Sequence, residues 1–275
     1  MMRSMFAAIS GLRVHQTALD VTANDIANVN TIGYKSARTT FKDSLSQLQR
    51  GAAAPGGGQG GANAAQIGLG VDVNSIDNLM QSGALQTTGA VLDVAIQGEG
   101  WLRVGAGTPP ALPTTFQYTR AGNFTRNQAG YLVTQDGYYV VGRTVSGGGV
   151  DTYLNIPAGA TNVSIGQDGS VSFDPAGGGP RVTAGYISLA KFANEAGLQR
   201  SSSNRWITSA ASGGEQVNTP GGGYGLTTSG AIEMSNVDLA AGFTGMITAQ
   251  RGFQANSRVI STADELLQDL VNLKR

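Results

Sequence analysis

The residues that could carry chemistry in this 275-residue chain are few and isolated. There is no cysteine, and His15 is the single histidine. Disulfides, thiolate nucleophiles, cysteine-based zinc sites and every mechanism that needs two imidazoles are therefore excluded. Gly11 and Leu19 lie four residues to either side of His15, so no acid or nucleophile shares its helix face. We interpret His15 as a surface or interface imidazole.

The carboxylates do not indicate a catalytic site either. Asp93 and Glu99 could form a glycosidase-like pair, but no recognisable set of catalytic residues accompanies them in the sequence. Asp151 and Asp168 resemble fragments of calcium loops, yet the full ligand set is missing and turn chemistry explains them better. No glycine-rich nucleotide loop and no nucleophile-elbow motif occurs. The sequence therefore predicts no catalytic, cofactor or metal site and no enzymatic activity.

Charge and composition exclude further classes. Lys+Arg and Asp+Glu both total 18, so the formal net charge is zero. A nucleic-acid binder needs a basic face, and binding to an anionic membrane surface needs a Lys/Arg cluster. Neither is present, and no apolar run has the length of a transmembrane helix. We expect no nucleic-acid partner and no membrane insertion.

A long helix is predicted at the N-terminus, over residues 4–29. Apolar and small residues recur there at alternating gaps of four and three, which is a heptad seam. The seam consists of Met5, Ile9, Leu12, Gln16, Leu19, Ala23 and Ile26. Asn28, Asn30 and Gly33 supply stop signals after it.

A second long helix is predicted over residues 236–274. Ser235 and Asp238 form an S-x-x-D capping signal at its start. The same spacing follows, with one stutter, in Leu239, Phe243, Met246, Gln250, Phe253, Ser257, Ile260, Ala263, Leu267, Leu270 and Leu273.

The middle of the chain has a different pattern. Residues 51–61 hold six glycines and one proline, a composition that loses too much backbone entropy to order alone. From about 91 to 210, short strand-like runs alternate with turn signals. Asp136-Gly137 and Asp168-Gly169 each separate two such runs and predict β-hairpins. The expected fold class is α+β: N- and C-terminal helices that pair as a coiled coil, with a central all-β domain.

The apolar seams of the two helices need partners. They pair with each other or with copies from other chains, because the β domain has no obvious place to bury both. Helices of unequal length leave part of a seam uncovered, which favours assembly, and a head-to-tail contact that does not close gives a filament. On the pattern alone, a two-helix stalk on a soluble β domain is equally compatible with the sequence.

Several segments resemble the bacterial flagellar axial proteins, the rod and hook family. The segment LDVTANDIANVNTIGYK (19–35) is similar to the family's N-terminal signature, and residues 233–275 are similar to its C-terminal helix. Its central β motifs look like LDVAIQGEGWLRV (92–104) and YTRAGNFTRNQAGYLVTQDGYYVVG (118–142). The positions that carry the family motif are Asn24, Ile26, Ala27, Asn28, Asn30, Gly33, Tyr34, Lys35, Asn236, Val237, Asp238, Gln250, Arg251, Gln254 and Asn256.

Three positions depart from the family pattern. Asp25 stands where the family often has Asn, and Gly242 and Gly245 stand where it usually has acidic residues. Each glycine in a helix interior costs up to about 1 kcal/mol, so the first turns of the C-terminal helix are expected to be less rigid.

The resemblance implies a structural protein of the flagellum that serves cell motility. Its terminal helices would stack as the inner tube of a hollow helical filament, with the β domain outside. Its partners would be further copies of itself, other flagellar axial and junction proteins, and the type III export apparatus, which exports such chains without a cleaved signal peptide. No cofactor is implied.

We therefore expect an inner core domain formed by residues 1–32 and 235–275. Residues 33–90 would be a Gly-rich linker and extended region, 91–210 the central β domain, and 211–234 a return linker. The predicted subunit-interface residues are Met5, Ile9, Leu12, Leu19, Ile26, Leu239, Phe243, Met246, Phe253, Ile260, Leu267 and Leu270.

Within the family, residues 33–51 and 249–275 look more like hook than distal rod members. We therefore expect a subunit of the flagellar hook, polymerised into a tube that transmits torque to the filament and serves as the export channel. The length, near that of distal rod members of the basal body, leaves a distal rod protein as the alternative. A carbohydrate-binding module or enzyme on a coiled-coil stalk, and an export chaperone or adhesin, are the competing classes.

Overall fold

The structure, a computed structural model, describes residues 2–55 and 60–273, without the side chain of Leu270. The chain forms two compact units. Unit 1 comprises Met1–Ala27, Ala37–Asn78 and Asp238–Arg275, and unit 2 comprises Asn28–Ser36 and Leu79–Val237. The expected α+β class is confirmed: the N- and C-terminal helices pack against each other, and the central part of the chain is β structure.

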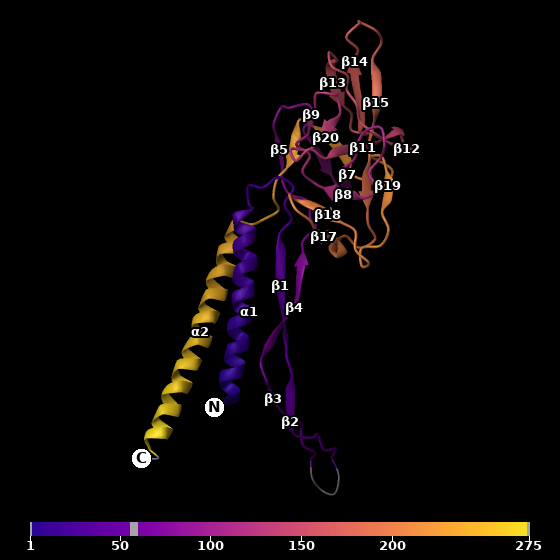
Figure 1. Ribbon diagram of the computed structural model, residues 1–275. Helices are drawn as coiled ribbons and strands as arrows, with labels where there is room; N and C mark the ends of the chain where they lie inside the picture. Colours follow the sequence, from indigo (N-terminus) through magenta and orange to yellow (C-terminus); the bar gives the residue numbers. More distant parts are fainter. Residues whose placement is uncertain (1, 56–59, 274–275) are drawn as a thin grey trace. The chain divides into compact units, whose positions relative to one another are not determined.

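Helices α1 (Met2–Ala27) and α2 (Leu239–Asn272) run antiparallel, side by side, in unit 1 (Figure 1). Their register follows from three close approaches. A Cβ atom added at Gly11 would lie 2.6 Å from the amide nitrogen of Asn256, and one added at Gly252 would lie 2.6 Å from the His15 ring. Near the other end of α1, Ile26 lies against Gly242.

The start of α2 differs from the predicted capping pattern. Asp238, not Ser235, is the N-cap: its backbone is extended, and its carboxylate accepts hydrogen bonds from the backbone N–H groups of Ala240 (2.8 Å) and Ala241 (3.2 Å). The Ser235 hydroxyl instead accepts from the N–H of Val237, before the helix begins. An Asp at this position satisfies two orphan donors and favours the positive end of the helix dipole.

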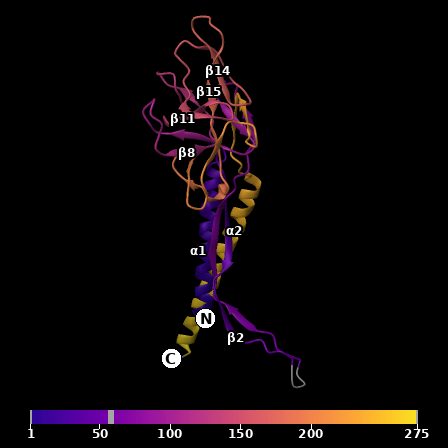
Figure 2. The ribbon, with the colours of Figure 1, turned by 90° about the vertical axis from the view of Figure 1, so that its right-hand side faces the viewer.

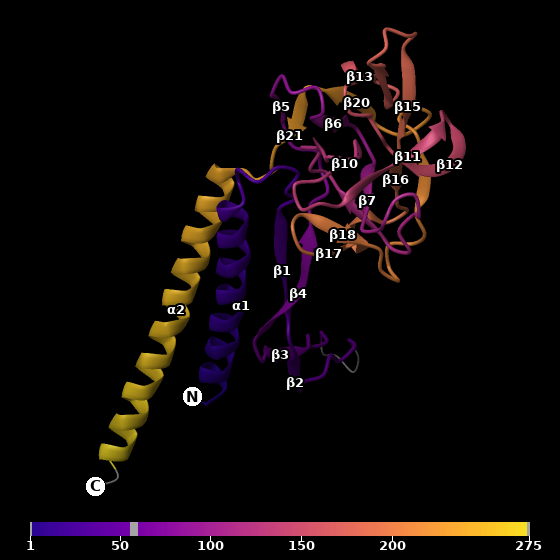
Figure 3. The same ribbon diagram turned by 45° about the horizontal axis from the view of Figure 1, so that its top comes forward.

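A long β ribbon completes unit 1. Strand β1 (Ala37–Asp43) pairs antiparallel with β4 (Val71–Asn78), and β2 (Ser46–Arg50) pairs with β3 (Ala65–Gly68). The β1–β4 pair lies along α1 on the side away from α2 (Figures 1 and 3), and the β2–β3 pair continues beyond it (Figure 2). The backbone N–H of Val71 donates to the Ser10 hydroxyl (3.2 Å).

Much of the region 33–90, expected to be a Gly-rich linker and extended region, is paired β strand among the residues that the structure describes. Within the Gly-rich segment 51–61, residues 56–59 lie outside the described residues, while Ala53 pairs with Ala62. The expected return linker 211–234 also contributes strands, β19 (Gln216–Asn218), β20 (Leu226–Ser229) and β21 (Ala231–Glu233). Strand β20 pairs with β6 (Val94–Gln97) and β21 with β5 (Leu85–Thr87). Strand β19 pairs with β16 (Leu189–Lys191). Strands of three or four residues are too short to show a periodicity in the sequence.

Unit 2 is built around one β-sheet whose strand pairs are antiparallel. Along its main path, neighbouring strands are hydrogen-bonded in the order β13-β14-β15-β11-β7-β8-β18-β17. The remaining elements are β7 (Trp101–Gly105), β8 (Phe116–Thr119), β9 (Thr125–Arg126), β10 (Leu132–Val133), β11 (Tyr139–Val145), β12 (Gly148–Tyr153), β13 (Thr161–Ile165), β14 (Ser170–Asp174), β15 (Val182–Ile187), β16 (Leu189–Lys191), the 3-10 helix η1 (Glu195–Gly197), β17 (Gln199–Arg200) and β18 (Arg205–Ile207). Both predicted hairpins are present. Gly137 and Gly169 take the positive φ angles, +82° and +77°, that their turns require.

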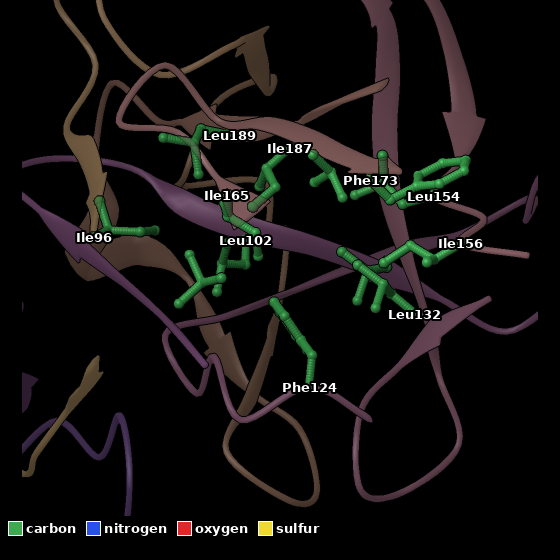
Figure 4. Close-up of a cluster of buried hydrophobic side chains, with 13 residues drawn as sticks. Ile96, Leu102, Phe124, Leu132, Leu154, Ile156, Ile165, Phe173, Ile187 and Leu189 are labelled. Atoms are coloured by element: carbon green, nitrogen blue, oxygen red, sulfur yellow. The ribbon is translucent and has the colours of Figure 1, made fainter. Parts of the chain in front are cut away.

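The core of unit 2 lies between these strands. Figure 4 shows its apolar side chains converging from several strands and from the loops between them. The labelled residues of this cluster are Ile96, Leu102, Phe124, Leu132, Leu154, Ile156, Ile165, Phe173, Ile187 and Leu189. A second cluster packs the Trp101 and Trp206 rings edge to face, with centroids 5.7 Å apart. Each such side chain contributes about 1.5–3 kcal/mol on burial, so unit 2 has its own apolar core.

Candidate assembly surface

Two segments that carry the family motif, residues 33–36 and 233–236, meet in unit 2 around a buried carboxylate. Both side-chain oxygens of Glu233 are bound: Lys35 Nζ donates to Oε1 (2.6 Å) and Arg120 Nη1 to Oε2 (3.1 Å). The N–H of Gly83 also donates to Oε1 (2.9 Å). The three charged side chains are almost completely inaccessible to solvent. Burial lowers the pKa of Lys35, while Glu233 opposes that shift.

Hydrogen bonds to backbone groups also join the same two segments. The Asn236 amide accepts from the N–H of Ser36 (2.7 Å) and donates to the carbonyl of Leu79 (2.8 Å). Gly33 donates to the Glu233 carbonyl (2.8 Å) with a φ of +66°, and a Cβ there would lie 2.5 Å from the nitrogen of Ala121. The two segments are therefore fixed to each other through residue types that the motif specifies.

In unit 1, the contact between α1 and α2 combines small residues of α2 with members of the predicted apolar seams. Gly242, Ala249, Asn256 and Ala263 recur every seven residues on α2 and are buried or half-buried. Gly242 is thus where Ile26 approaches, and not only a weak point of the helix. At Gly245, by contrast, an added Cβ would meet open space. A seven-residue repeat of small residues was the sequence signal that could have identified this face.

The predicted interface residues lie beside that contact and remain accessible to different extents. Those on α1 are all half-buried: Met5, Ile9, Leu12, Leu19 and Ile26. On α2, Met246, Ile260 and Leu267 are half-buried, and the side chain of Leu270 lies outside the part that the structure describes.

The largest predicted residues at the start of α2 are exposed. Phe243 is 50% exposed, and its neighbour one turn on, Ile247, is 53% exposed. Leu239 and Phe253 are exposed on the same side of the helix. We call these four residues the α2 apolar face. An apolar face of this kind, uncovered within one chain, is typical of a protein–protein contact.

The remaining motif residues fall into separate groups. Asn28 and Asn30 lie in unit 2 beside a polar depression that Asn123 and Asn204 also line. On the helices, Asn24, Ala27, Gln250, Arg251 and Gln254 are exposed, and Val237 and Asp238 lead into α2. Arg200 stacks on Tyr34 and donates to its hydroxyl (3.0 Å).

Asp25, where the family often has Asn, is buried and accepts hydrogen bonds from the Ala37 N–H with both carboxylate oxygens (3.0 and 3.2 Å). This acceptor role needs only a side-chain oxygen, so either residue type can supply it.

The groups considered for catalysis have structural partners. His15 packs edge to face on Phe41, with ring centroids 6.0 Å apart, and against Gly252. Asp93 accepts a hydrogen bond from the Thr88 hydroxyl, and Glu99 forms an exposed ion pair with Lys191. Within residues 2–55 and 60–273, no group of three or more acidic or imidazole side chains is placed to hold a metal ion, and no helix is long and apolar enough to cross a membrane.

Comparison with known proteins assigns the family. Three family models match the chain: flagella basal body rod protein at residues 5–35, the D1 domain of flagellar hook protein FlgE/F/G at 95–173, and the C-terminal region of flagellar basal body rod FlgEFG protein at 228–273. The chain is 48% identical over 277 residues to the flagellar basal-body rod protein FlgG of Bacillus subtilis, covering all of both chains. The chain belongs to the flagellar rod and hook family.

The expected membership in this axial family is confirmed, and with it a place among structural proteins of the flagellum. The FlgG protein of Agrobacterium fabrum is 39% identical over 96% of this chain and 97% of its own. These rod proteins align with the chain at nearly equal length, whereas the alignment with the hook protein FlgE of Borreliella burgdorferi covers both chains but is 27% identical and extends over 441 residues.

The expectation of a hook subunit is therefore wrong. The similarity favours the rod proteins of the family, at nearly the same length as this chain. The prediction of a hook subunit rested partly on residues 249–275. Most of that segment matches a family model that describes FlgE, FlgF and FlgG together. Such a segment identifies the rod and hook family but does not separate its members.

Proposed function

We propose that this chain is a structural subunit of the distal rod of the flagellar basal body, polymerised with copies of itself into a hollow helical tube. The observation that carries the proposal is its end-to-end similarity to FlgG rod proteins, at 48% identity in one case, without a large insertion. Through the same rod it would contact other flagellar axial and junction proteins, transmit torque towards the hook, and surround the export channel.

The α1–α2 pair and the α2 apolar face supply the physical basis for polymerisation. Two packed long helices resist twisting better than loops, because each backbone hydrogen bond lies along the helix axis. Apolar side chains that one chain leaves in water give each added subunit a free-energy gain of about 25 cal/mol per Å² of apolar surface covered. We propose that the predicted interface residues of both helices act in this way.

Export through the flagellum's own type III apparatus suits such a chain. A chain without cysteine forms no disulfide that would have to be reduced before unfolding. Its helices gain most of their stability from packing, so covering their exposed apolar side chains in the rod would stabilise them further. Its activity is mechanical, and we propose no chemical conversion.

A deletion strain tests the proposal. Removing the gene from the bacterium that carries it is expected to abolish both the distal rod and the hook in purified basal bodies viewed by electron microscopy. Expression of the wild-type chain from a plasmid should restore both structures. A deletion strain that keeps a complete rod and lacks only the hook would contradict the proposal.

A further inference from the structure

A groove runs between α1 and β4 in unit 1. Phe6, Ile9, Arg13 and Thr17 line it from α1, and Val71 and Val73 line it from β4. Its volume is about 480 Å³. Apolar and polar side chains share its lining about equally. Arg13 at its edge is exposed and forms no ion pair with any other residue that the structure describes. Asp72 also lies at the edge.

The end of α2 carries a matching row of apolar side chains. Val259, Leu266 and Leu273 recur every seven residues and are all exposed, Leu266 by 54% and Leu273 by 82%. We call this set the tail row. The α1–α2 register places Met2 opposite Glu265, and Ala263 is the last fully buried residue among those of α2 whose side chains the structure describes. Residues 266–273 thus extend beyond the first turn of α1, as Figures 1 and 3 show.

The groove and the tail row offer one pair of opposite charges. Asp269 lies one turn from Leu266 and Leu273, whereas Asp264, two residues before Leu266, lies on the far side of α2. In the sequence Arg258 precedes the row and Lys274 and Arg275 follow it, so the acidic side chain beside the row is Asp269. An acidic side chain is unfavourable near a helix C-terminus, because the helix dipole is negative there. Arg13 of a partner that covers the row would offset the repulsion at Asp269.

The tail of the same chain cannot fill the groove. Gly11 and His15 face α2, whereas the groove residues Phe6, Arg13 and Thr17 lie on the opposite side of α1, towards β4. Helix α2 is continuous to Asn272, so its end cannot fold back around α1. At 1.5 Å per residue the groove from Phe6 to Thr17 is about 16 Å long, whereas the whole tail row from Val259 to Leu273 spans about 21 Å. The overhang that carries Leu266 and Leu273 is about 12 Å long and fits within the groove.

We propose that the α1–β4 groove of each subunit binds the tail row of the next copy of this chain, with Arg13 of one copy paired to Asp269 of the other. This inference rests on the proposed function and adds to it the identity of one contact. The two surfaces are different patches of one molecule, so the contact is heterologous and need not close, which is what a filament requires.

Cysteine cross-linking tests the contact directly, because the natural chain has no cysteine. A chain carrying both Phe6→Cys and Leu266→Cys is assembled into rods and treated with a short bismaleimide. We expect a ladder of linked dimers, trimers and larger species on a denaturing gel. Each single variant is the matched control and should give no ladder.

Rods of normal yield without a ladder, in which a monofunctional maleimide labels both cysteines, would overturn the inference and leave the proposed function intact. A cross-link to a different protein would overturn it as well. Failure of the wild-type chain to form any rod would instead contradict the proposed function.

A charge exchange decides the matter even if the cysteine variant does not assemble. Arg13→Glu and Asp269→Lys are each expected to reduce rod yield at least tenfold, and the two changes in one chain should restore most of it. A double variant that assembles no better than either single variant would overturn the proposed pairing.

Discussion

Replacing Phe243 and Ile247 together by Asp is expected to reduce rod assembly at least tenfold while leaving the single chain folded. Both side chains are about half exposed in one molecule, so in the monomer the change resembles a surface substitution, worth about 0.5 kcal/mol or less each. In a rod, the same positions would place two carboxylates against apolar surface. That costs more than the 1.4 kcal/mol that corresponds to tenfold in affinity. Rod yield is measured by electron microscopy of purified basal bodies, and folding by circular dichroism.

The control variant uses the same helix and the same charges. Thr244 and Thr248 are exposed on α2 but belong to a different side from the α2 apolar face, and their hydroxyls bond only to carbonyls of their own helix. Thr244→Asp with Thr248→Asp should assemble at near wild-type yield. Equal loss of assembly in both double variants would mean that added charge, and not the apolar face, is responsible.

The second large effect is expected at Glu233. In Glu233→Gln, the ammonium of Lys35 and the guanidinium of Arg120 remain buried without their counter-charge, although the shape of the side chain is nearly kept. Breaking a buried pair on one side costs about 3–5 kcal/mol. For a unit of this size that lowers the melting temperature by about 10 °C, which differential scanning calorimetry measures directly.

Glu99→Gln provides the comparison. Glu99 also pairs with a lysine, Lys191, but its side chain is mostly exposed. Exposed pairs contribute about 0–1 kcal/mol, so the melting temperature should fall by no more than about 3 °C. If the two glutamine variants melt at the same temperature, the Glu233 cluster does not stabilise unit 2 as described.

Hydrophobic periodicity and turn residues were sufficient to predict the two terminal helices and two of the β-hairpins from the sequence. The four-three spacing located both terminal helices within three residues of their ends, because a packed helix must repeat its buried positions. Asp136-Gly137 and Asp168-Gly169 located two hairpins, because few residues other than glycine adopt their positive φ angles.

The tertiary contacts were not accessible in the same way. Glu233 looks like any surface glutamate in the sequence, and only the fold brings Lys35 and Arg120 to it across 198 and 113 residues. The predicted seams include Ile26 and Ala263, which lie at the face between the helices, but not Gly242 and Gly252, whose lack of a side chain allows the backbones to approach. Local patterns cannot separate the side of a helix that packs within the chain from the side left for other molecules.

Chemical accessibility of the α2 apolar face in monomer and rod is the most direct test of this account. In an Ile247→Cys chain, the single thiol should react with a maleimide freely in the monomer and at least tenfold more slowly in the assembled rod, since a neighbouring subunit would cover it. The reaction rate of Thr244→Cys, which lies on a different side of α2, should change much less between monomer and rod. Equal reaction rates at residue 247 in monomer and rod would contradict the claim that copies of this chain cover its exposed apolar face.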